Sequence, residues 1–336
     1  MDNMKKIGVI GAGSFGTALA IILAKKGNQV TLWARNTCQI EEMKESRENK
    51  KYLPEVLLPE TIDYTSELEL AVKDKDYLLF AVPAQSFRSV LKEAEKYFNH
   101  DVPVINVAKG IEKGTLKRLS QVAEEVMADV KYVALSGPSH AEEVAREMPT
   151  TVVAACADHD LAVEVQNLFN TDRFRVYTNE DLTGVELGGA LKNIIALGAG
   201  ISDGMGFGDN AKAAMMTRGI TEMTRLGLAL GADMSTFSGL AGIGDLIVTC
   251  TSMHSRNRRC GILIGQGTAP AEATKEIGMV VEGISTAEAA YALARECAIE
   301  MPITENIYRI IHGEIDACQA VDYLMGRMTK NEMKIL

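Results

Sequence analysis

Short apolar runs alternate with helical patterns through the first half of the chain, and this alternation most limits what the chain can fold into. The runs that read as strands lie within residues 5–13, 29–35, 76–83, 103–110, 131–138, 150–157 and 174–179. Most of them end in a turn-forming sequence that leads towards a helix. Alternation of this kind predicts a parallel sheet covered by helices on both faces.

The strand pattern stops after about residue 181. Residues 211–231 and 285–299 have the period of helices, and neither an internal repeat nor a low-complexity linker separates the two halves. A chain of 336 residues is long enough for two domains. The sequence therefore predicts a Rossmann-type doubly wound α/β domain at 1–181, which would bind a dinucleotide, joined directly to an all-helical substrate and catalytic domain at 182–336.

A glycine-rich turn joins the first predicted strand to the first predicted helix. Gly11-Ala12-Gly13-Ser14-Phe15-Gly16 matches G-x-G-x-x-G in the strand–turn–helix context that makes this motif specific. Gly11 permits the tight turn, Gly13 lets the backbone approach a pyrophosphate, and Gly16 lets the helix pack on the strand. The helix N-terminus then stabilises the phosphate charge. The turn predicts a nicotinamide or related dinucleotide as cofactor.

The end of the second strand bears on which dinucleotide binds. NAD sites commonly carry a carboxylate there for the adenosine ribose, but this chain has Ala34, Arg35 and Asn36, and its first acid is Glu41. Arg35 can pair with a 2′-phosphate, which favours NADP(H) and leaves NAD(H) possible. An arginine that stacks on adenine would look the same in sequence.

Lys192 lies in the helical stretch 184–200 without an acidic or polar neighbour three or four residues away. Gly188, Gly189 and Ala196 lie at that spacing, and Ala199 lies about one turn further along the same face. A solvated helical lysine usually has a polar companion at this distance. Small residues instead let another segment, or a ligand, come close to the ammonium group.

Ligands of open parallel sheets bind beyond the carboxyl ends of the strands, where three turns are expected to lie. They are 81–83, 108–110 and 136–139. Lys109 follows an apolar strand and can reach such a cleft, although a solvated loop lysine fits its position too. Ser139 fits a helix N-cap, a substrate-binding role, or both.

The second half contains a glycine-rich segment, 239–246, followed by hydroxyl, amide and basic side chains at 249–259. The glycines bring the backbone close to another group. The hydroxyls, Asn257 and the arginines 256, 258 and 259 suit a phosphate, because arginine offers a planar fork to phosphate oxygens. A purely structural basic loop remains the alternative.

Charge and cysteine usage exclude several classes of protein. A formal charge of −10 argues against broad binding to nucleic acid or to a membrane surface. We find neither an export signal nor a run of about 18 uncharged apolar residues, the length that a membrane helix requires. The six cysteines form no C-x-x-C pair, so free thiols in a cytoplasmic protein are expected. Cys250, His254 and Cys260 fit no standard zinc spacing, and we expect no metal site.

Taken together, these segments resemble the NAD(P)-dependent glycerol-3-phosphate dehydrogenase family of bacterial type. The matching motifs run in order from residue 7 to about 290: GAGSFGTALA, Asn49-x-x-Tyr52-Leu53-Pro54, AVPAQ, AKGIE, SGPSHAEEV, ELGGALKNIIALGAG, GLAGIGDLIVTCTS and SRNRRCG. Phe15 stands where many members have tryptophan, and His140 where many have phenylalanine. Both departures keep a flat side chain and bear only on fine cofactor contacts.

The resemblance implies an oxidoreductase that reduces dihydroxyacetone phosphate reversibly to sn-glycerol 3-phosphate with NAD(P)H, supplying phospholipid synthesis. It implies that Lys192 is the catalytic acid/base. The substrate site would comprise Lys109, Gly137, Ser139, Lys192, Asp245, Ser255, Arg256 and Asn257. The cofactor would contact Gly11, Gly13, Ser14, Phe15, Gly16, Arg35, Tyr52, Lys109, Ala141, Arg256, Val280 and Glu282. Asp245 would position the lysine or a substrate hydroxyl.

Two alternatives remain from the sequence. One is a related two-domain dehydrogenase acting on a hydroxy acid or sugar acid, which would not need the Ser-Arg-Asn cluster. The other is a non-catalytic NADPH sensor, which would leave the placement of Lys192 unexplained. The sequence leaves the oligomeric state open, with a homodimer as one alternative.

Overall fold

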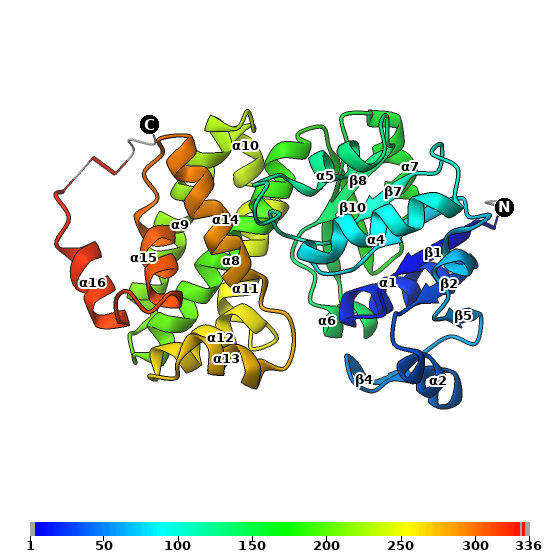
Figure 1. Cartoon of the computed structure of the whole chain (residues 1–336), viewed down its shortest axis with the longest axis horizontal. Coiled ribbons are helices and arrows are strands. Elements are labelled where there is room, and N and C mark those ends of the chain that lie inside the picture. Colours follow the sequence, from blue (N-terminus) through cyan, green and yellow to red (C-terminus); the bar gives the residue numbers. More distant parts are fainter. Residues whose placement is uncertain (1–3, 330, 333–336) are drawn as a thin grey trace. The chain divides into compact units, whose positions relative to one another are not determined.

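The structure is a computed structural model that describes residues 4–329 and 331–332. The chain divides into two compact units (Figure 1). The first unit runs to Ala108 and includes Leu119–Leu182; the second unit comprises Lys109–Arg118 and the chain from Thr183 onward. The predicted boundary at 181/182 is not tested by this division. The segment 109–118, however, groups with the second unit, although the sequence predicts it in the first domain.

Contacts of the segment Lys109–Arg118 explain this grouping. Ile111 is completely buried in the apolar core of the second unit. Arg118 donates a 2.6 Å hydrogen bond to the carboxylate of Glu186, which is itself nearly buried. Removing the segment would expose apolar surface and take the Arg118 ion pair away from a largely buried carboxylate.

An eight-stranded sheet forms the centre of the first unit, in the order β10-β9-β8-β7-β6-β1-β2-β5. Its strands are β1 (Lys6–Ile10), β2 (Gln29–Trp33), β5 (Ile62–Thr65), β6 (Tyr77–Phe80), β7 (Val104–Asn106), β8 (Tyr132–Ser136), β9 (Thr150–Ala155) and β10 (Phe174–Asn179). The seven strands predicted from apolar runs are confirmed; β5 was not predicted. The doubly wound α/β class is confirmed by the solved relatives described below.

One strand pair runs against the predicted parallel direction. β9 pairs with β8 antiparallel, whereas β10 pairs with β9 parallel, so the sheet is mixed. The connection from β8 to β9 contains only the short helix α6 (Ala141–Ala145). A parallel crossover needs a connection that returns along the full strand length, which a helix this short does not provide.

Helices cover both faces of the sheet, and alternate residues of each strand face opposite sides. On one face, Ile7, Val9 and Leu79 share a core with α1 (Ser14–Lys25), α6 and α7 (His159–Phe169). On the other, Phe80 packs edge-on against Phe87 of α4 (Phe87–Ala94). The remaining helices of this unit are α2 (Thr37–Ser46), α3 (Leu68–Val72), α5 (Leu119–Val126) and the 3₁₀ turns η1 (Ala84–Ser86) and η2 (Glu95–Tyr97).

A small hairpin, which the sequence did not predict, follows α2. Its strands β3 (Glu48–Asn49) and β4 (Leu53–Leu57) pair antiparallel with an irregular register. The hairpin carries the motif Asn49-x-x-Tyr52-Leu53-Pro54.

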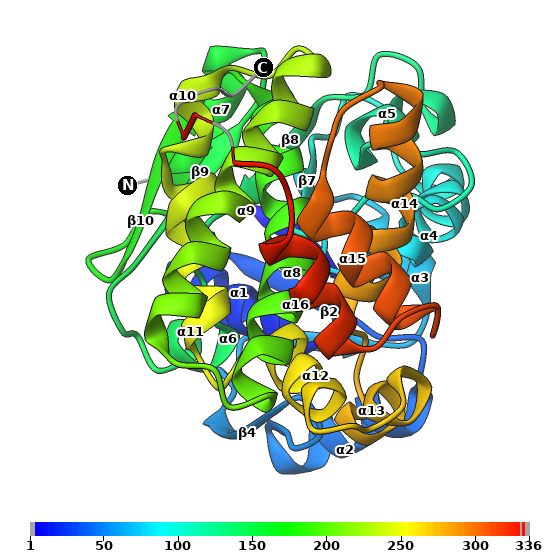
Figure 2. The ribbon, with the colours of Figure 1, turned by 90° about the vertical axis from the view of Figure 1, so that its left-hand side faces the viewer.

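The described part of the second unit is helical, as predicted, apart from the isolated bridge between Ile111 and Arg118. It contains α8 (Leu182–Gly204), α9 (Asp209–Ala229), α10 (Met234–Phe237), the π-turn η3 (Leu240–Gly244), α11 (Asp245–Thr251), α12 (Arg256–Gly265), α13 (Pro270–Ile277), α14 (Glu282–Glu296), α15 (Pro302–Ile311) and α16 (Ala317–Met325). Figure 2 shows α8 among the other helices of this unit.

Helix α8 is the core helix of the second unit. By length and composition it could cross a membrane, but 94% of its apolar window is buried inside the protein. Glycines along it permit the close packing of neighbours. A Cβ added at Gly188 would lie 2.5 Å from the carbonyl oxygen of Ala241, and one at Gly200 would lie 2.1 Å from that of Arg258. Gly188 and Gly200 therefore let η3 and α12 approach α8.

Candidate active site

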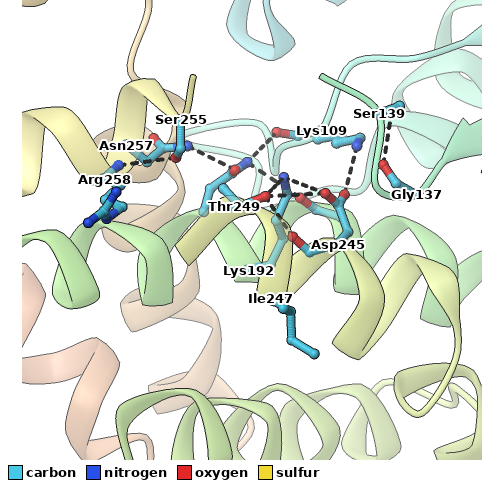
Figure 3. Close-up of polar contacts among 12 residues, drawn as sticks. Lys109, Gly137, Ser139, Lys192, Asp245, Ile247, Thr249, Ser255, Asn257 and Arg258 are labelled. Carbon is cyan, nitrogen blue, oxygen red and sulfur yellow. Dashed lines mark hydrogen bonds and ion pairs between the residues drawn. The ribbon is translucent and has the colours of Figure 1, made fainter. Parts of the chain in front are cut away.

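Two lysines of the second unit converge on one carboxylate (Figure 3). Lys192 Nζ donates a 2.9 Å hydrogen bond to Asp245 Oδ1, and Lys109 Nζ donates a 2.7 Å bond to Oδ2 of the same side chain. Lys192 comes from the middle of α8, Asp245 begins α11, and Lys109 begins the segment that groups with this unit. The companion that Lys192 lacks within its own helix is thus supplied by another segment.

Burial sets the electrostatics of this cluster. Lys192 is 6% exposed and Asp245 is 2% exposed. Burial, together with the nearby charge of Lys109, lowers the pKa of Lys192 to about 8, although Asp245 acts in the opposite direction. Burial alone would raise the pKa of Asp245, but the charges of Lys109 and Lys192 outweigh it and hold that pKa below its usual value. The carboxylate therefore stays ionised while the ammonium can lose its proton near neutral pH.

Thr249 is a member of the site that the sequence did not single out. Its hydroxyl oxygen accepts a 2.7 Å hydrogen bond from Lys192 Nζ and donates a 2.6 Å bond to the carbonyl oxygen of Asp245. The two residues lie one turn apart on α11, so the i, i+4 spacing after Gly244 was the available signal. Within the described part of the chain, Lys192 has acceptors for two of its three N–H donors. The third N–H can reach a further acceptor.

An amide relay joins this cluster to α12 and α14. Asn257 Nδ2 donates a 2.9 Å hydrogen bond to Asn193 Oδ1, and Asn257 Oδ1 accepts a 2.9 Å bond from the backbone N–H of Gly283. Asn193 Nδ2 lies 3.4 Å from the carbonyl oxygen of Lys109. Asn193 adjoins Lys192 in sequence but was not predicted as a site residue. These hydrogen bonds tie Asn193, the residue after Lys192, to Lys109, α12 and α14.

Several side chains of the predicted phosphate loop, 249–259, are bound within the protein. Ser255 is the N-cap of α12 and accepts a hydrogen bond from the N–H of Arg258, so it and Asn257 are both tied to the fold. Arg258 forms a 2.8 Å ion pair with Asp203 and donates to the carbonyl of Thr251, so it supports the loop. Arg256 is half-buried at the first position of α12.

The glycines of 239–246 lie close to protein backbone. A Cβ at Gly242 would lie 2.1 Å from the carbonyl oxygen of Phe237, and Gly188 of α8 meets Ala241. These glycines permit the π-turn η3, which places Asp245 beside Lys192. Val280, which is exposed, and Glu282, the first residue of α14, follow at the other end of the amide relay.

In the first unit, the glycine turn has the geometry expected for a dinucleotide site. Gly11 has φ +122°, a conformation that favours glycine, and a Cβ at Gly16 would lie 2.0 Å from the carbonyl oxygen of Gly11. A Cβ at Gly13 would meet nothing within 4 Å, so its backbone is open to a ligand. Ser14 and Phe15 open α1, whose first N–H groups have no acceptors within the helix. The residues present fit a pyrophosphate.

Arg35 lies just beyond β2 and is exposed. Among the described residues its side chain has no ion pair or hydrogen bond, so it can pair with a ligand. Tyr52 lies in the β3–β4 hairpin with Lys51 Nζ 5.1 Å from its ring centre. Both side chains belong to the segments that follow β2.

The β8–α6 turn carries the other predicted residues of the first unit. Gly137 has φ +140°, and Ala141 begins α6. Ser139 is not the helix N-cap, which is His140; its hydroxyl instead donates a 3.0 Å hydrogen bond to the carbonyl of Gly137. The N-cap interpretation of Ser139 is therefore wrong, because the helix begins one residue later.

The described residues include no group of three or more His, Cys, Asp or Glu side chains placed to hold a metal ion. The cysteines described are free thiols. Burial raises the pKa of Cys250, which follows Thr249, to about 12. Its thiol stays protonated beside the lysine.

The chain is similar to known proteins along nearly its whole length. Two family models match it: the NAD-dependent glycerol-3-phosphate dehydrogenase N-terminus over residues 6–162, and the C-terminus of the same family over 181–322. A relative from Pelotomaculum thermopropionicum, named glycerol-3-phosphate dehydrogenase (NAD(P)+), is 53% identical over 333 residues, 98% of this chain and 95% of that protein. A relative of the same name from a Thermoanaerobacter species is 54% identical over 328 residues, 98% of this chain and 99% of that protein.

A solved structure agrees with these relatives. The crystal structure of glycerol-3-phosphate dehydrogenase from Coxiella burnetii superposes with a TM-score of 0.93 at 40% identity, covering 96% of this chain and 99% of that one. Family models, curated relatives and structure all point to one family. This chain belongs to the NAD-dependent glycerol-3-phosphate dehydrogenase family.

Proposed function

We propose that this chain catalyses the reversible reduction of dihydroxyacetone phosphate to sn-glycerol 3-phosphate with NAD(P)H, and that Lys192 is its acid/base. One observation carries the assignment of Lys192: a buried ammonium group, held by Asp245 and Thr249, keeps one N–H donor available. A ketone reduction requires a proton at oxygen as well as a hydride at carbon, and the nicotinamide, when bound, supplies the hydride.

The chemistry of Lys192 follows from its surroundings. Its available N–H would donate to the substrate carbonyl oxygen, polarise the carbonyl and deliver the proton as charge develops. In the reverse direction, the neutral amine would remove the proton of the alcohol. A pKa lowered to about 8 by burial lets Lys192 adopt both states near neutral pH. Asp245 holds the amine in place and stabilises its charged form.

The substrate would be held by groups from several segments. Arg256 is the proposed cation for the phosphate, with Ser255, the N-cap of α12, and Asn257 on either side of it in the sequence. Lys109, Gly137 and Ser139 complete the proposed substrate set. Two lysines on one carboxylate leave an excess of positive charge, which suits an anionic substrate in a chain with a formal charge of −10.

The proposed cofactor residues are those of the glycine turn, Arg35, Tyr52, Lys109, Ala141, Arg256, Val280 and Glu282. We propose that NADP(H) is preferred, because the residues directly after β2, Ala34, Arg35 and Asn36, include no carboxylate and the exposed Arg35 has no partner among the described residues. We further propose cytoplasmic localisation and the division into a dinucleotide-binding domain, 1–181, and a substrate domain, 182–336. A homodimer is the oligomer that we would test first.

One assay separates this function from its alternatives. NADPH oxidation is measured with dihydroxyacetone phosphate, with unphosphorylated dihydroxyacetone and with small 2-oxo acids. Turnover that requires the phosphorylated ketone supports the proposal. Faster turnover of 2-oxo acids would identify a hydroxy-acid dehydrogenase, and NADPH binding without turnover of any of them would indicate a sensor.

A further inference from the structure

Asn49, the first residue of the motif Asn49-x-x-Tyr52-Leu53-Pro54, has no role in the function described so far, yet it contacts the glycine turn. Asn49 lies in the β3–β4 hairpin and is only 1% exposed. Its Nδ2 donates a 3.0 Å hydrogen bond to the carbonyl oxygen of Ala12 and a 2.8 Å bond to Thr17 Oγ1. One amide group thus binds both the turn and the first part of α1.

A second amide reaches the same carbonyl. Gln39 of α2 donates a 2.8 Å hydrogen bond from Nε2 to the oxygen of Ala12 and lies 3.5 Å from Asn49 Oδ1. A carbonyl oxygen has two lone pairs, so Asn49 and Gln39 together saturate it. Both donors come from the segment that follows β2, where Arg35 also lies.

Saturating this oxygen determines where the next N–H points. The peptide that joins Ala12 to Gly13 is planar and trans, so its C=O and its N–H point in opposite directions. Holding the oxygen against Asn49 and Gln39 directs the N–H of Gly13 away from them. Gly13 is also the residue at which an added Cβ would meet nothing within 4 Å. The backbone of Gly13 is therefore open to a ligand on the side that a Cβ would occupy.

We propose that Asn49 is a positioning residue for the dinucleotide pyrophosphate: it fixes the Ala12–Gly13 peptide so that the N–H of Gly13 is aimed at a phosphate oxygen. This inference rests on the proposed nicotinamide cofactor. The pyrophosphate is common to NADPH and NADH, so Asn49 strengthens the binding of both equally. Arg35, just beyond β2, remains the residue that would distinguish NADPH from NADH, and Lys192 remains the proposed acid/base.

The test compares ligands with and without a pyrophosphate. Asn49→Ala is titrated calorimetrically with NADPH, NADH, ADP-ribose and 2′-AMP. We expect the dissociation constants of the three pyrophosphate ligands to rise about tenfold, the scale of one or two lost hydrogen bonds, and that of 2′-AMP to change less than about twofold. The kcat at saturating NADPH should remain within about twofold of wild type.

Two further variants keep the outcome interpretable. Asn28→Ala is the matched control, because Asn28 also donates its amide to a backbone carbonyl of the first unit, that of Leu23 at 3.0 Å. Gln39→Ala removes one of the two donors to Ala12 and leaves Asn49 in place, so it tests the same peptide if Asn49→Ala fails to fold. It should weaken the pyrophosphate ligands selectively, by about threefold.

Each outcome has one meaning. Equal weakening of 2′-AMP and the pyrophosphate ligands, no weakening, or the same selectivity in Asn28→Ala would overturn the role of Asn49. If Asn49→Ala does not fold, an unselective Gln39→Ala would overturn it. A wild-type protein that binds neither NADPH nor NADH would instead overturn the proposed function.

Discussion

Lys192 and Asp245 form a 2.9 Å ion pair across 53 positions of the chain, and both side chains are nearly fully buried. Burying two charges is costly, and hydrogen bonds from Lys109 to Asp245 and from Lys192 to Thr249 offset part of that cost. An arrangement of this cost is typical of a site that needs a lysine with a perturbed pKa.

Thr249→Val tests whether the hydroxyl supports the charged lysine. Losing this acceptor disfavours the ammonium and lowers the pKa of Lys192 further. We expect kcat for ketone reduction to fall about tenfold or more, the scale of a lost hydrogen bond to a charged group. Reduction requires protonated Lys192, so the wild-type rate should fall as pH rises through about 8, and the variant's fall should begin at lower pH.

The matched control for Thr249→Val is Thr224→Val. Thr224 is also buried in a helix of the second unit, and its hydroxyl donates only to the carbonyl of Ile220. Both rate–pH profiles are measured at saturating substrates. Identical profiles for the two variants would show that the Thr249 hydroxyl does not act on Lys192.

Arg256→Ala tests the phosphate contact. We expect the KM for dihydroxyacetone phosphate to rise strongly. Activity with unphosphorylated dihydroxyacetone, which we expect to be poor already, should change far less, because only the phosphorylated ketone carries the charge that a guanidinium binds. Steady-state kinetics with both substrates check this. Arg309→Ala, which removes an arginine paired 3.5 Å from Glu314, is the control. Equal losses on both substrates would mean that Arg256 serves the fold or the cofactor alone.

Arg35→Ala tests cofactor choice. A well-formed pair to the 2′-phosphate contributes roughly 1.5–3 kcal/mol, so NADPH should be weakened about ten- to hundredfold and NADH much less. Arg35→Asp should go further, repelling the 2′-phosphate and offering an acceptor to the NADH ribose. Fluorescence titrations of the wild type and both variants with NADPH and NADH measure these changes in affinity. Equal weakening by Arg35→Ala would show that Arg35 stacks on adenine.

Glu222 predicts a pH dependence of stability. Its carboxylate accepts hydrogen bonds from the N–H groups of Ile303 and Thr304 at the start of α15, yet burial raises its pKa from 4.5 to about 7. Between these two values the folded state binds more protons than the unfolded state, so this group's contribution declines as pH rises from about 4.5 to 7. The decline is at most about 3 kcal/mol.

Urea unfolding of the wild type and of Glu222→Gln at several pH values isolates this contribution, because other titrating groups are common to both proteins. The free energy of unfolding of the wild type should fall relative to the variant between pH 4.5 and 7. A constant difference across that range would show that Glu222 does not titrate there.

The sequence was sufficient for the parts of the fold that depend on local pattern. The glycine turn, its flanking strand and helix, and the odd position of Lys192 are all properties of short segments. The antiparallel direction of β9 was not predicted, because the apolar pattern of a strand is the same in both directions. The direction depends instead on the connection from β8, which contains only the short helix α6. The β3–β4 hairpin was missed because β3 spans only Glu48–Asn49.

The candidate site was predicted where a motif marks it and missed where only folding brings residues together. Lys192 and Asp245 belong to recognisable segments. Thr249 lies 57 positions from Lys192 and looks like any helical threonine in sequence. Asn49 was noticed as part of a motif, but its contacts with Ala12 and Thr17 depend on a hairpin that local pattern does not reveal.

The most direct test of the central claim is the kcat of Lys192→Ala for reduction of dihydroxyacetone phosphate. Lys212→Ala is measured alongside, since Lys212 is a largely buried lysine of the same unit paired with Asp203 at 2.8 Å. We predict that Lys192→Ala loses about 10²-fold or more, the scale of a lost general acid, while NADPH binding persists and Lys212→Ala stays near wild type. Turnover near the wild-type rate in folded Lys192→Ala would contradict the role of Lys192 as the acid.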